Sequence, residues 1–166
     1  MKRTAPTKTQ ILSIPLIIGI VLIVFGTRFI LLAQATKDWQ QTQAAISQVN
    51  LIENTSSTST TISKQTKFDI SVLYRYQVNG KQYQSDKYSY GDGKTVKNRL
   101  KNKLVAQQWL QKSPYQTDNE ISIYYNPKKP QQAVIKTGSN IWTFIPLIIG
   151  LLITLVFAFI LWRVKK

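Results

Sequence analysis

Two long apolar segments lie near opposite ends of this 166-residue chain, and most of its polar residues lie between them. The first segment covers residues 11–33 and the second covers residues 141–162. A helix of roughly 20 apolar residues crosses the hydrocarbon core of a bilayer. A chain of this length has too small a soluble core to bury two such helices on all sides. The sequence therefore predicts two transmembrane helices that flank one small domain, residues 34–140.

The first segment carries one charged residue, Arg28, whereas the second carries none. An arginine near a helix end can extend its side chain to the headgroups, so Arg28 is compatible with a span. The segment also resembles a secretory signal, because Lys2 and Arg3 precede it and Ala-Gln-Ala follows at 33–35. It is longer than the roughly 7–15 residues of a usual signal core. This length favours an uncleaved anchor, and cleavage after Ala35 is the alternative.

Basic residues predict the orientation of the chain in the membrane. The short tails, residues 1–10 and 163–166, are rich in lysine and arginine, and short basic tails remain in the cytoplasm. Residues 34–140 form too long a loop for charge counting, although lysines just before the second span favour the opposite orientation. Trp39 is typical of an interfacial aromatic anchor. We therefore expect a multi-pass cell-membrane protein with both termini cytoplasmic and the central domain extracytoplasmic, at the cell envelope.

The sequence Ile-Pro-Leu-Ile-Ile-Gly occurs in both apolar segments, at 14–19 and at 145–150. Each proline is expected in the first turn of its helix, where the missing N–H costs little. Gly19 and Gly150 would allow two helices to approach closely. In antiparallel helices, however, the two copies would lie at opposite membrane faces and would not meet within one chain. The repeat therefore favours chance similarity between two apolar segments.

A β-hairpin is the clearest pattern in the central domain. Residues 68–78 alternate between apolar and mostly polar side chains, which is the period of a half-buried strand. An Asn-Gly pair follows, as a two-residue type I′ turn prefers, and the return strand is expected over residues 81–90. This register places Tyr76 opposite Tyr83. Tyr74, Tyr76 and Tyr83 are candidate interface aromatics, although packing between strands is the favoured interpretation.

The rest of the domain is predicted from composition and periodicity. A strand is expected within residues 37–53, and the nearly continuous Ser/Thr run at 55–63 is typical of a flexible loop. Residues 95–112 predict an amphipathic helix, because apolar side chains recur at helical spacing. Two more strands are expected over residues 120–125 and 132–136. The predicted fold class is a membrane α+β protein, in which two transmembrane helices flank a small antiparallel β domain with one amphipathic helix.

Basic side chains on the expected helix form two stripes. They are the candidate contacts for an anionic surface such as anionic lipid or a wall polymer: Lys94, Lys97, Arg99, Lys101 and Lys103. A solvated helix face is the alternative interpretation. Besides the lipid bilayer, a membrane-protein partner or a second copy of the chain is expected. Nucleic acid is disfavoured, because the domain is expected outside the cytoplasm.

The composition excludes several kinds of active site. The sequence contains no cysteine and no histidine, so it has no thiolate nucleophile, imidazole base or zinc–sulfur site. Gly-Lys-Thr at 93–95 lacks the earlier glycine of a phosphate-binding loop. We therefore expect a non-enzymatic protein and assign no catalytic, cofactor-binding or metal-binding residue. The alternative is a membrane enzyme that uses Asp86, Asp92 or Asp118 beside lysines.

Two stretches of the central domain resemble a known bacterial family. They are Tyr-Arg-Tyr-Gln-Val-Asn-Gly-Lys-Gln-Tyr at 74–83 and Ile-Ser-Ile-Tyr-Tyr-Asn-Pro-Lys-Lys-Pro, which begins the stretch at 121–135. Both are similar to the pattern of domain of unknown function 3592, which is set between transmembrane helices. The resemblance covers roughly residues 39–138, and the chain departs from the pattern in its Ser/Thr run and its lysine-rich expected helix. It implies no activity, cofactor or catalytic residue.

Overall fold

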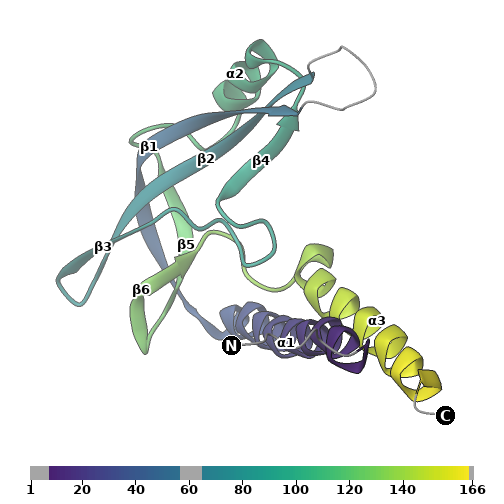
Figure 1. The fold of residues 1–166 in the computed structure, drawn as a ribbon. Helices are drawn as coiled ribbons and strands as arrows, with labels where there is room; N and C mark the ends of the chain where they lie inside the picture. The colour runs from purple at the N-terminus through teal and green to yellow at the C-terminus, as the bar shows by residue number, and fades with distance from the viewer. Residues whose placement is uncertain (1–7, 57–64, 165–166) are drawn as a thin grey trace, which may run out of the picture. The chain divides into compact units, whose positions relative to one another are not determined.

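The computed structural model describes residues 8–56 and 65–164. One compact unit contains the helices near the two chain ends, and the other is the domain of residues 33–139 (Figure 1). Most of the Ser/Thr run at 55–63 lies outside the described residues. Its first two residues belong to strand β1 (Gln40–Ser56), which is therefore longer than the sequence predicts.

Two long helices form the first unit. Helix α1 spans Lys8–Ala35 with 28 residues, and helix α3 spans Ile141–Val164 with 24 residues. At about 1.5 Å per residue they are about 42 and 36 Å long, and a bilayer core is about 30 Å thick. Both are long and apolar enough to cross a membrane. Because each helix begins more than a turn before its proline, Pro15 and Pro146 lie in the second turn rather than in the expected first turn.

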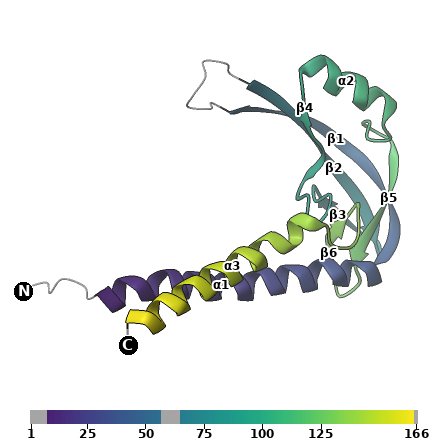
Figure 2. The same cartoon turned by 90° about the vertical axis from the view of Figure 1, so that its right-hand side faces the viewer.

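Glycines allow α1 and α3 to pack closely side by side (Figure 2). A Cβ atom on Gly150 would lie 2.8 Å from the Gly19 carbonyl oxygen, and one on Gly19 would lie 2.5 Å from the Thr154 hydroxyl. Gly26 is equally crowded, since its Cβ would lie 2.5 Å from the Leu147 nitrogen. The expectation that the two repeat copies do not meet is therefore wrong at their final glycines. Each of these glycines lies close to the middle of its helix, where antiparallel helices meet.

We predict that Gly150→Val weakens the α1–α3 pair by about 1–3 kcal/mol, because the new side chain would overlap the backbone of α1. The free energy of helix separation, measured by steric trapping of the full chain in bicelles, checks this. Leu151→Val is the control, since Leu151 is 45% exposed and its replacement creates no overlap. Equal effects of the two substitutions would contradict the close contact.

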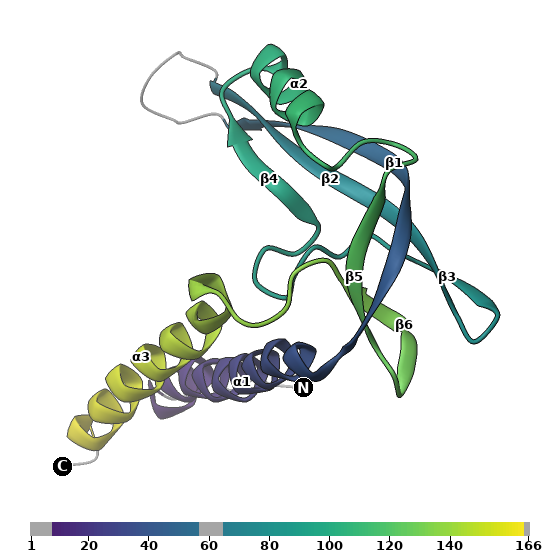
Figure 3. The same ribbon diagram turned by 180° about the vertical axis from the view of Figure 1, so that it is seen from behind.

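Domain 33–139 is built on an antiparallel sheet (Figure 3). After the short 3-10 helix η1 (Thr36–Asp38), the elements in chain order are β1 (Gln40–Ser56), β2 (Gln65–Val78), β3 (Lys81–Ser85), β4 (Thr95–Leu100), α2 (Lys103–Lys112), β5 (Glu120–Asn126) and β6 (Lys129–Val134). The strand order is β3-β2-β1-β5-β6, and β4 pairs with the same edge of β2 as β3 does. The two longest strands, β1 and β2, therefore hold the whole sheet together.

The sheet curls until its outer strands β3 and β6 meet. Tyr76 donates a hydrogen bond to the Pro130 carbonyl at 2.6 Å, and Ser85 donates one to the Ala133 carbonyl at 3.2 Å. The apolar core enclosed in this way comes from β1, β2, β5 and β6: Ala44, Ile46, Val72, Tyr74, Tyr76, Val78, Ile121, Ile123 and Ala133. These residues follow the two-residue period of strands, so one face of each strand is buried.

The β2–β3 hairpin confirms the predicted turn and register. The Asn-Gly pair at 79–80 has φ angles of 50° and 76°, the positive values that a type I′ turn requires. Tyr76 pairs with Tyr83, and their ring centroids are 5.8 Å apart. The return strand ends at Ser85, so the expected extension to residue 90 is wrong. Beyond it, the Tyr88 carbonyl accepts backbone hydrogen bonds from the segment that follows β6.

Strands β5 and β6 follow the prediction in part. Strand β5 confirms the strand expected over 120–125, whereas β6 begins and ends earlier than the expected 132–136. The Asn126 side chain accepts hydrogen bonds from the backbone of Lys128 at 2.9 Å and Lys129 at 3.3 Å. These bonds close a tight turn, so strand pairing resumes at once.

The helix predicted over 95–112 is wrong in its first half. Residues 95–100 form β4, because β2 offers a free edge there and Leu100 is buried beside Ile70 and Ala106. The helix begins only after Asn102, whose side chain accepts a hydrogen bond from the Val105 backbone at 2.9 Å. An N-cap of this kind defines the first turn of a helix. Ala106, rather than the larger apolar residues, provides the buried contact of α2.

Candidate functional site

The two ends of domain 33–139 are joined at one place, the base, which consists of residues 33–39 and 133–139. The Thr36 side chain lies at its centre and is only 1% exposed. Its hydroxyl accepts a hydrogen bond from the Gly138 backbone at 2.8 Å and donates one to the Ala33 carbonyl at 2.7 Å. The Thr36 hydroxyl is buried and both donates and accepts a hydrogen bond. It therefore links the two ends of the domain firmly.

A second contact at the base supports the first. Gln34 donates a side-chain hydrogen bond to the Ser139 hydroxyl at 2.8 Å. Gly138 has a φ angle of 85°, a conformation that glycine adopts without strain. The segment at the end of α1 and the segment that leads into α3 are therefore held together within the domain.

Backbone contacts bring three segments that carry lysines together at the base. The Lys37 side chain lies across Gly138, since a Cβ atom there would be 3.3 Å from the Lys37 Cε atom. Lys136 donates its backbone hydrogen bond to the Tyr88 carbonyl at 2.8 Å, which brings the Lys87 segment beside it. The base therefore gathers positive charge from residues far apart in the sequence.

A pocket of about 110 Å³ opens at the base. It is lined by Trp39, Ser85, Lys87, Tyr90, Gln131, Gln132 and Ala133. The Lys87 ammonium lies 4.4 Å from the centroid of the Tyr90 ring, within the range of a cation–π interaction. The Tyr90 ring in turn packs edge-on against Trp39, with centroids 6.3 Å apart. The pocket thus combines a positioned cation with two aromatic rings.

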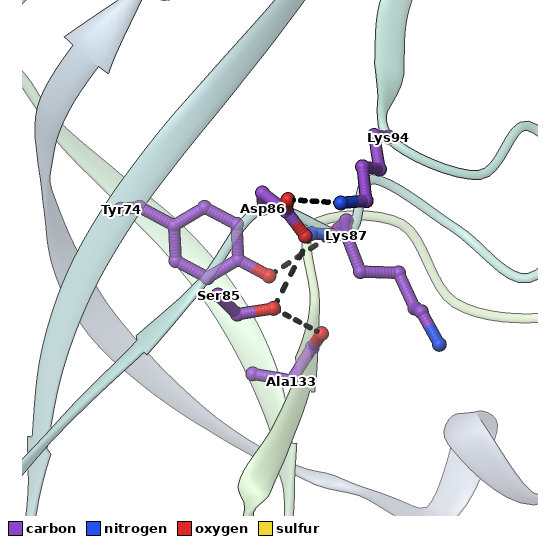
Figure 4. Close-up of polar contacts among 6 residues, drawn as sticks. All are labelled: Tyr74, Ser85, Asp86, Lys87, Lys94 and Ala133. Carbon is purple, nitrogen blue, oxygen red and sulfur yellow. Dashed lines mark hydrogen bonds and ion pairs between the residues drawn. The ribbon is translucent and has the colours of Figure 1, made fainter.

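Hydrogen bonds fix the backbone that carries Lys87 (Figure 4). The Ser85 hydroxyl accepts a hydrogen bond from the Lys87 nitrogen at 3.3 Å and donates one to the Ala133 carbonyl. The buried Tyr74 hydroxyl donates to the Lys87 carbonyl at 2.9 Å. The position of Lys87 is therefore set by contacts of its backbone rather than of its charged end.

The neighbouring carboxylate, Asp86, is already paired. Its oxygen lies 2.6 Å from the Lys94 ammonium, and the Lys87 side chain extends the other way (Figure 4). This pair is partly exposed and adds little stability. Because Asp86 is paired with Lys94, Asp86 does not form an ion pair with Lys87.

Burial keeps the tyrosines of this region neutral. Burial raises the pKa of Tyr90 above its usual range, and it raises the pKa of Tyr74 further. For Tyr76, burial and the neighbouring Tyr83 raise the pKa to about 12. These side chains act as hydrogen-bond donors and ring surfaces, not as proton-transfer groups near neutral pH.

The five basic residues predicted to contact an anionic surface do not form helical stripes, since only Lys103 lies on α2. Lys94 pairs with Asp86, and the Lys97 ammonium lies 5.8 Å from the centroid of the Trp109 ring. Arg99 has a φ angle of 56° at the end of β4. Lys101 and Lys103 are exposed on either side of the Asn102 cap.

The predicted interface aromatics lie mainly inside the domain. Tyr74 is 0% exposed and Tyr76 is 4% exposed, so neither presents a surface to a partner. Tyr83 is partly buried and packs against the same core. Their positions support the favoured interpretation, packing between strands.

Each candidate carboxylate of the alternative enzyme has its own local setting, and Asp86 and Asp92 share the loop between β3 and β4. Asp86 pairs with Lys94, and Asp92 accepts a hydrogen bond from the Ser89 hydroxyl at 2.9 Å. Asp118 has a φ angle of 68° in the turn before β5. Within residues 8–56 and 65–164, no three acidic residues lie close enough together to hold a metal ion.

A second surface lies where α2 covers β1 and β2. Across the described part of the domain, the exposed large apolar side chains all belong to β1 and α2: Leu51, Ile52, Leu104 and Val105. Leu51 lines an apolar pocket of about 180 Å³ between β1 and α2. Leu104, which is 63% exposed, lines the neighbouring hollow along α2. We call this region the α2 surface.

Sequence reasoning missed Lys87, Tyr90 and the two glutamines at 131–132 as neighbours. Trp39 was predicted as an aromatic anchor, and the structure places it on the pocket wall. No periodic pattern marks the other residues, because they meet only when β3 and β6 close the sheet.

The fold and its two junctions define a class: small antiparallel β domains joined at both ends to helices long enough to span a membrane. The family model for a domain of unknown function (DUF3592) matches residues 42–140. The chain therefore belongs to the DUF3592 family, which confirms the resemblance seen in its sequence. No curated protein matches the chain.

Ionisation of the buried tyrosines should destabilise the domain at high pH. The pKa of Tyr76 is about 12 in the folded chain and about 10 when unfolded. The neutral phenol is therefore favoured by folding, and this stability is present below about pH 10 and lost as the pH rises through 12. Thermal unfolding of the full chain in detergent should show a midpoint that falls above about pH 10. Tyr76→Phe should make this fall shallower, and an unchanged slope would contradict the assignment.

Proposed function

We propose that this chain is a non-enzymatic membrane protein that crosses the bilayer twice and presents domain 33–139 at the outer face of the cell membrane. The hydropathy and length of α1 and α3 support the two spans. The base supports attachment at both ends, because Thr36 and Gly138 tie the two junctions of the domain together. The basic tails support cytoplasmic termini.

The domain serves as a binding module, and a second membrane protein is its partner. The observation that carries this proposal is the α2 surface, where exposed Leu51 and Leu104 line two neighbouring hollows. An apolar patch of this kind on a water-exposed domain is typical of an interaction site. Lys101 and Lys103 come just before its most exposed residue, Leu104, so the complementary partner surface is apolar with an acidic edge.

Topology is the first test. We predict that a cysteine at Gln84, which is exposed on β3, reacts with a membrane-impermeant thiol reagent on intact cells. A cysteine at Thr4, in the N-terminal tail, should react only after the cells are lysed. The native chain contains no cysteine, so every signal comes from the introduced residue. The reverse pattern would place the domain in the cytoplasm and would overturn the proposed orientation.

The α2 surface is tested by crosslinking in intact cells. We predict that a photoreactive amino acid at Gln107, which lines both hollows of this surface, forms a defined adduct with one membrane protein. Leu104→Asp should reduce that adduct at least about tenfold, because it removes apolar contact and reverses the local charge. Gln84→Asp introduces the same charge on β3 and should leave the adduct unchanged. Equal yields in all three proteins would contradict the α2 surface as the docking site.

A further inference from the structure

We propose that the pocket at the base of the domain binds the phosphate group of an anionic lipid headgroup. This inference rests on the membrane insertion proposed above, but it concerns a different site from the α2 surface. The Lys87 ammonium would pair with the phosphate beside the rings of Tyr90 and Trp39.

The chemistry of the pocket suits an anion. Its lining residues include one cation, Lys87, and no carboxylate. The carboxylate next in sequence, Asp86, is held by Lys94 at 2.6 Å. An ammonium can form charge-assisted hydrogen bonds to phosphate oxygens.

The size of the pocket limits the ligand. The pocket measures about 110 Å³. Pockets for whole drug-sized ligands or cofactors usually measure about 300–1,000 Å³. The pocket therefore suits a single small group, such as a phosphate whose remaining chain extends outwards.

Chain connectivity places the pocket within reach of lipid headgroups. Trp39 lies four residues after Ala35, where α1 ends, so the two are at most about 14 Å apart. At the other side of the pocket, Ala133 lies on the segment that Thr36 and Gly138 hold against the start of the domain. Tryptophan at this position is typical of the membrane interface. A membrane phosphate is therefore a nearer source than a soluble one.

The structure separates Lys87 from the lysines that the sequence pattern singled out. The Lys87 ammonium is positioned over Tyr90 beside a pocket, whereas Lys103 is exposed at the start of α2. Substituting the Lys87 side chain leaves its backbone contacts with Ser85 and Tyr74 in place. Lys87→Gln and Lys103→Gln therefore form a matched pair with the same change in charge.

The test is native mass spectrometry of the full chain in detergent, titrated with phosphatidylglycerol. We expect one phosphatidylglycerol to bind more tightly than phosphatidylcholine, and Lys87→Gln to raise its Kd about tenfold, as loss of a charged hydrogen bond should. Lys87→Arg should retain most of the affinity, and Lys103→Gln should change the Kd less than twofold. Equal effects of Lys87→Gln and Lys103→Gln would show that only overall charge matters and would overturn the site.

Two further measurements distinguish the lipid site from a free-anion site and from the α2 surface. Inorganic phosphate that binds as tightly as phosphatidylglycerol would overturn the lipid as the ligand and assign the pocket to a free anion. The Gln107 adduct should be the same in Lys87→Gln as in the native chain, because the α2 surface is a separate site. Failure of the topology test together with normal phosphatidylglycerol binding would reject the proposed orientation and leave the lipid site standing.

Discussion

The pairing of β1 with β2 on one edge and with β5 on the other is the constraint on which the domain depends. Strand β1 pairs with β5 along its first residues and with β2 along most of its length. Strand β2 in turn pairs with β3 and β4. A pair this long twists strongly, so the ends of the sheet approach each other. The contact between β3 and β6 then closes the core around Tyr74 and Tyr76.

Closure of the sheet also builds the base. The segment after β3 meets the segment after β6 through the Tyr88 carbonyl, and Thr36 ties the same region to the start of the domain. Positive charge and aromatic rings that belong to three separate segments therefore share one end of the domain. The α2 surface arises differently, because α2 covers β1 and β2 only partly and leaves Leu51 and Leu104 exposed. The domain thus presents two distinct surfaces.

Local patterns predicted the elements that depend on near neighbours. The Asn-Gly turn, the Tyr76–Tyr83 pair and strand β5 were all predicted correctly. The prediction of one helix over 95–112 failed because apolar residues at helical spacing also suit a strand followed by a capped helix. Strand β2 decides between them, since its free edge pairs with β4. The contact between Gly19 and Gly150 was missed because sequence spacing does not show where two helices cross.

The sequence by itself determined the two apolar helices, the hairpin and the DUF3592 family, because each depends on residues close together in the chain or on a continuous pattern. Only the tertiary structure decided which charges and rings become neighbours. The five basic residues predicted to share a helix face do not lie together, because about half of that segment is a strand. Lys87, Tyr90 and Trp39 lie together instead, because the curled sheet brings β3 to β6 and the two ends of the domain to each other.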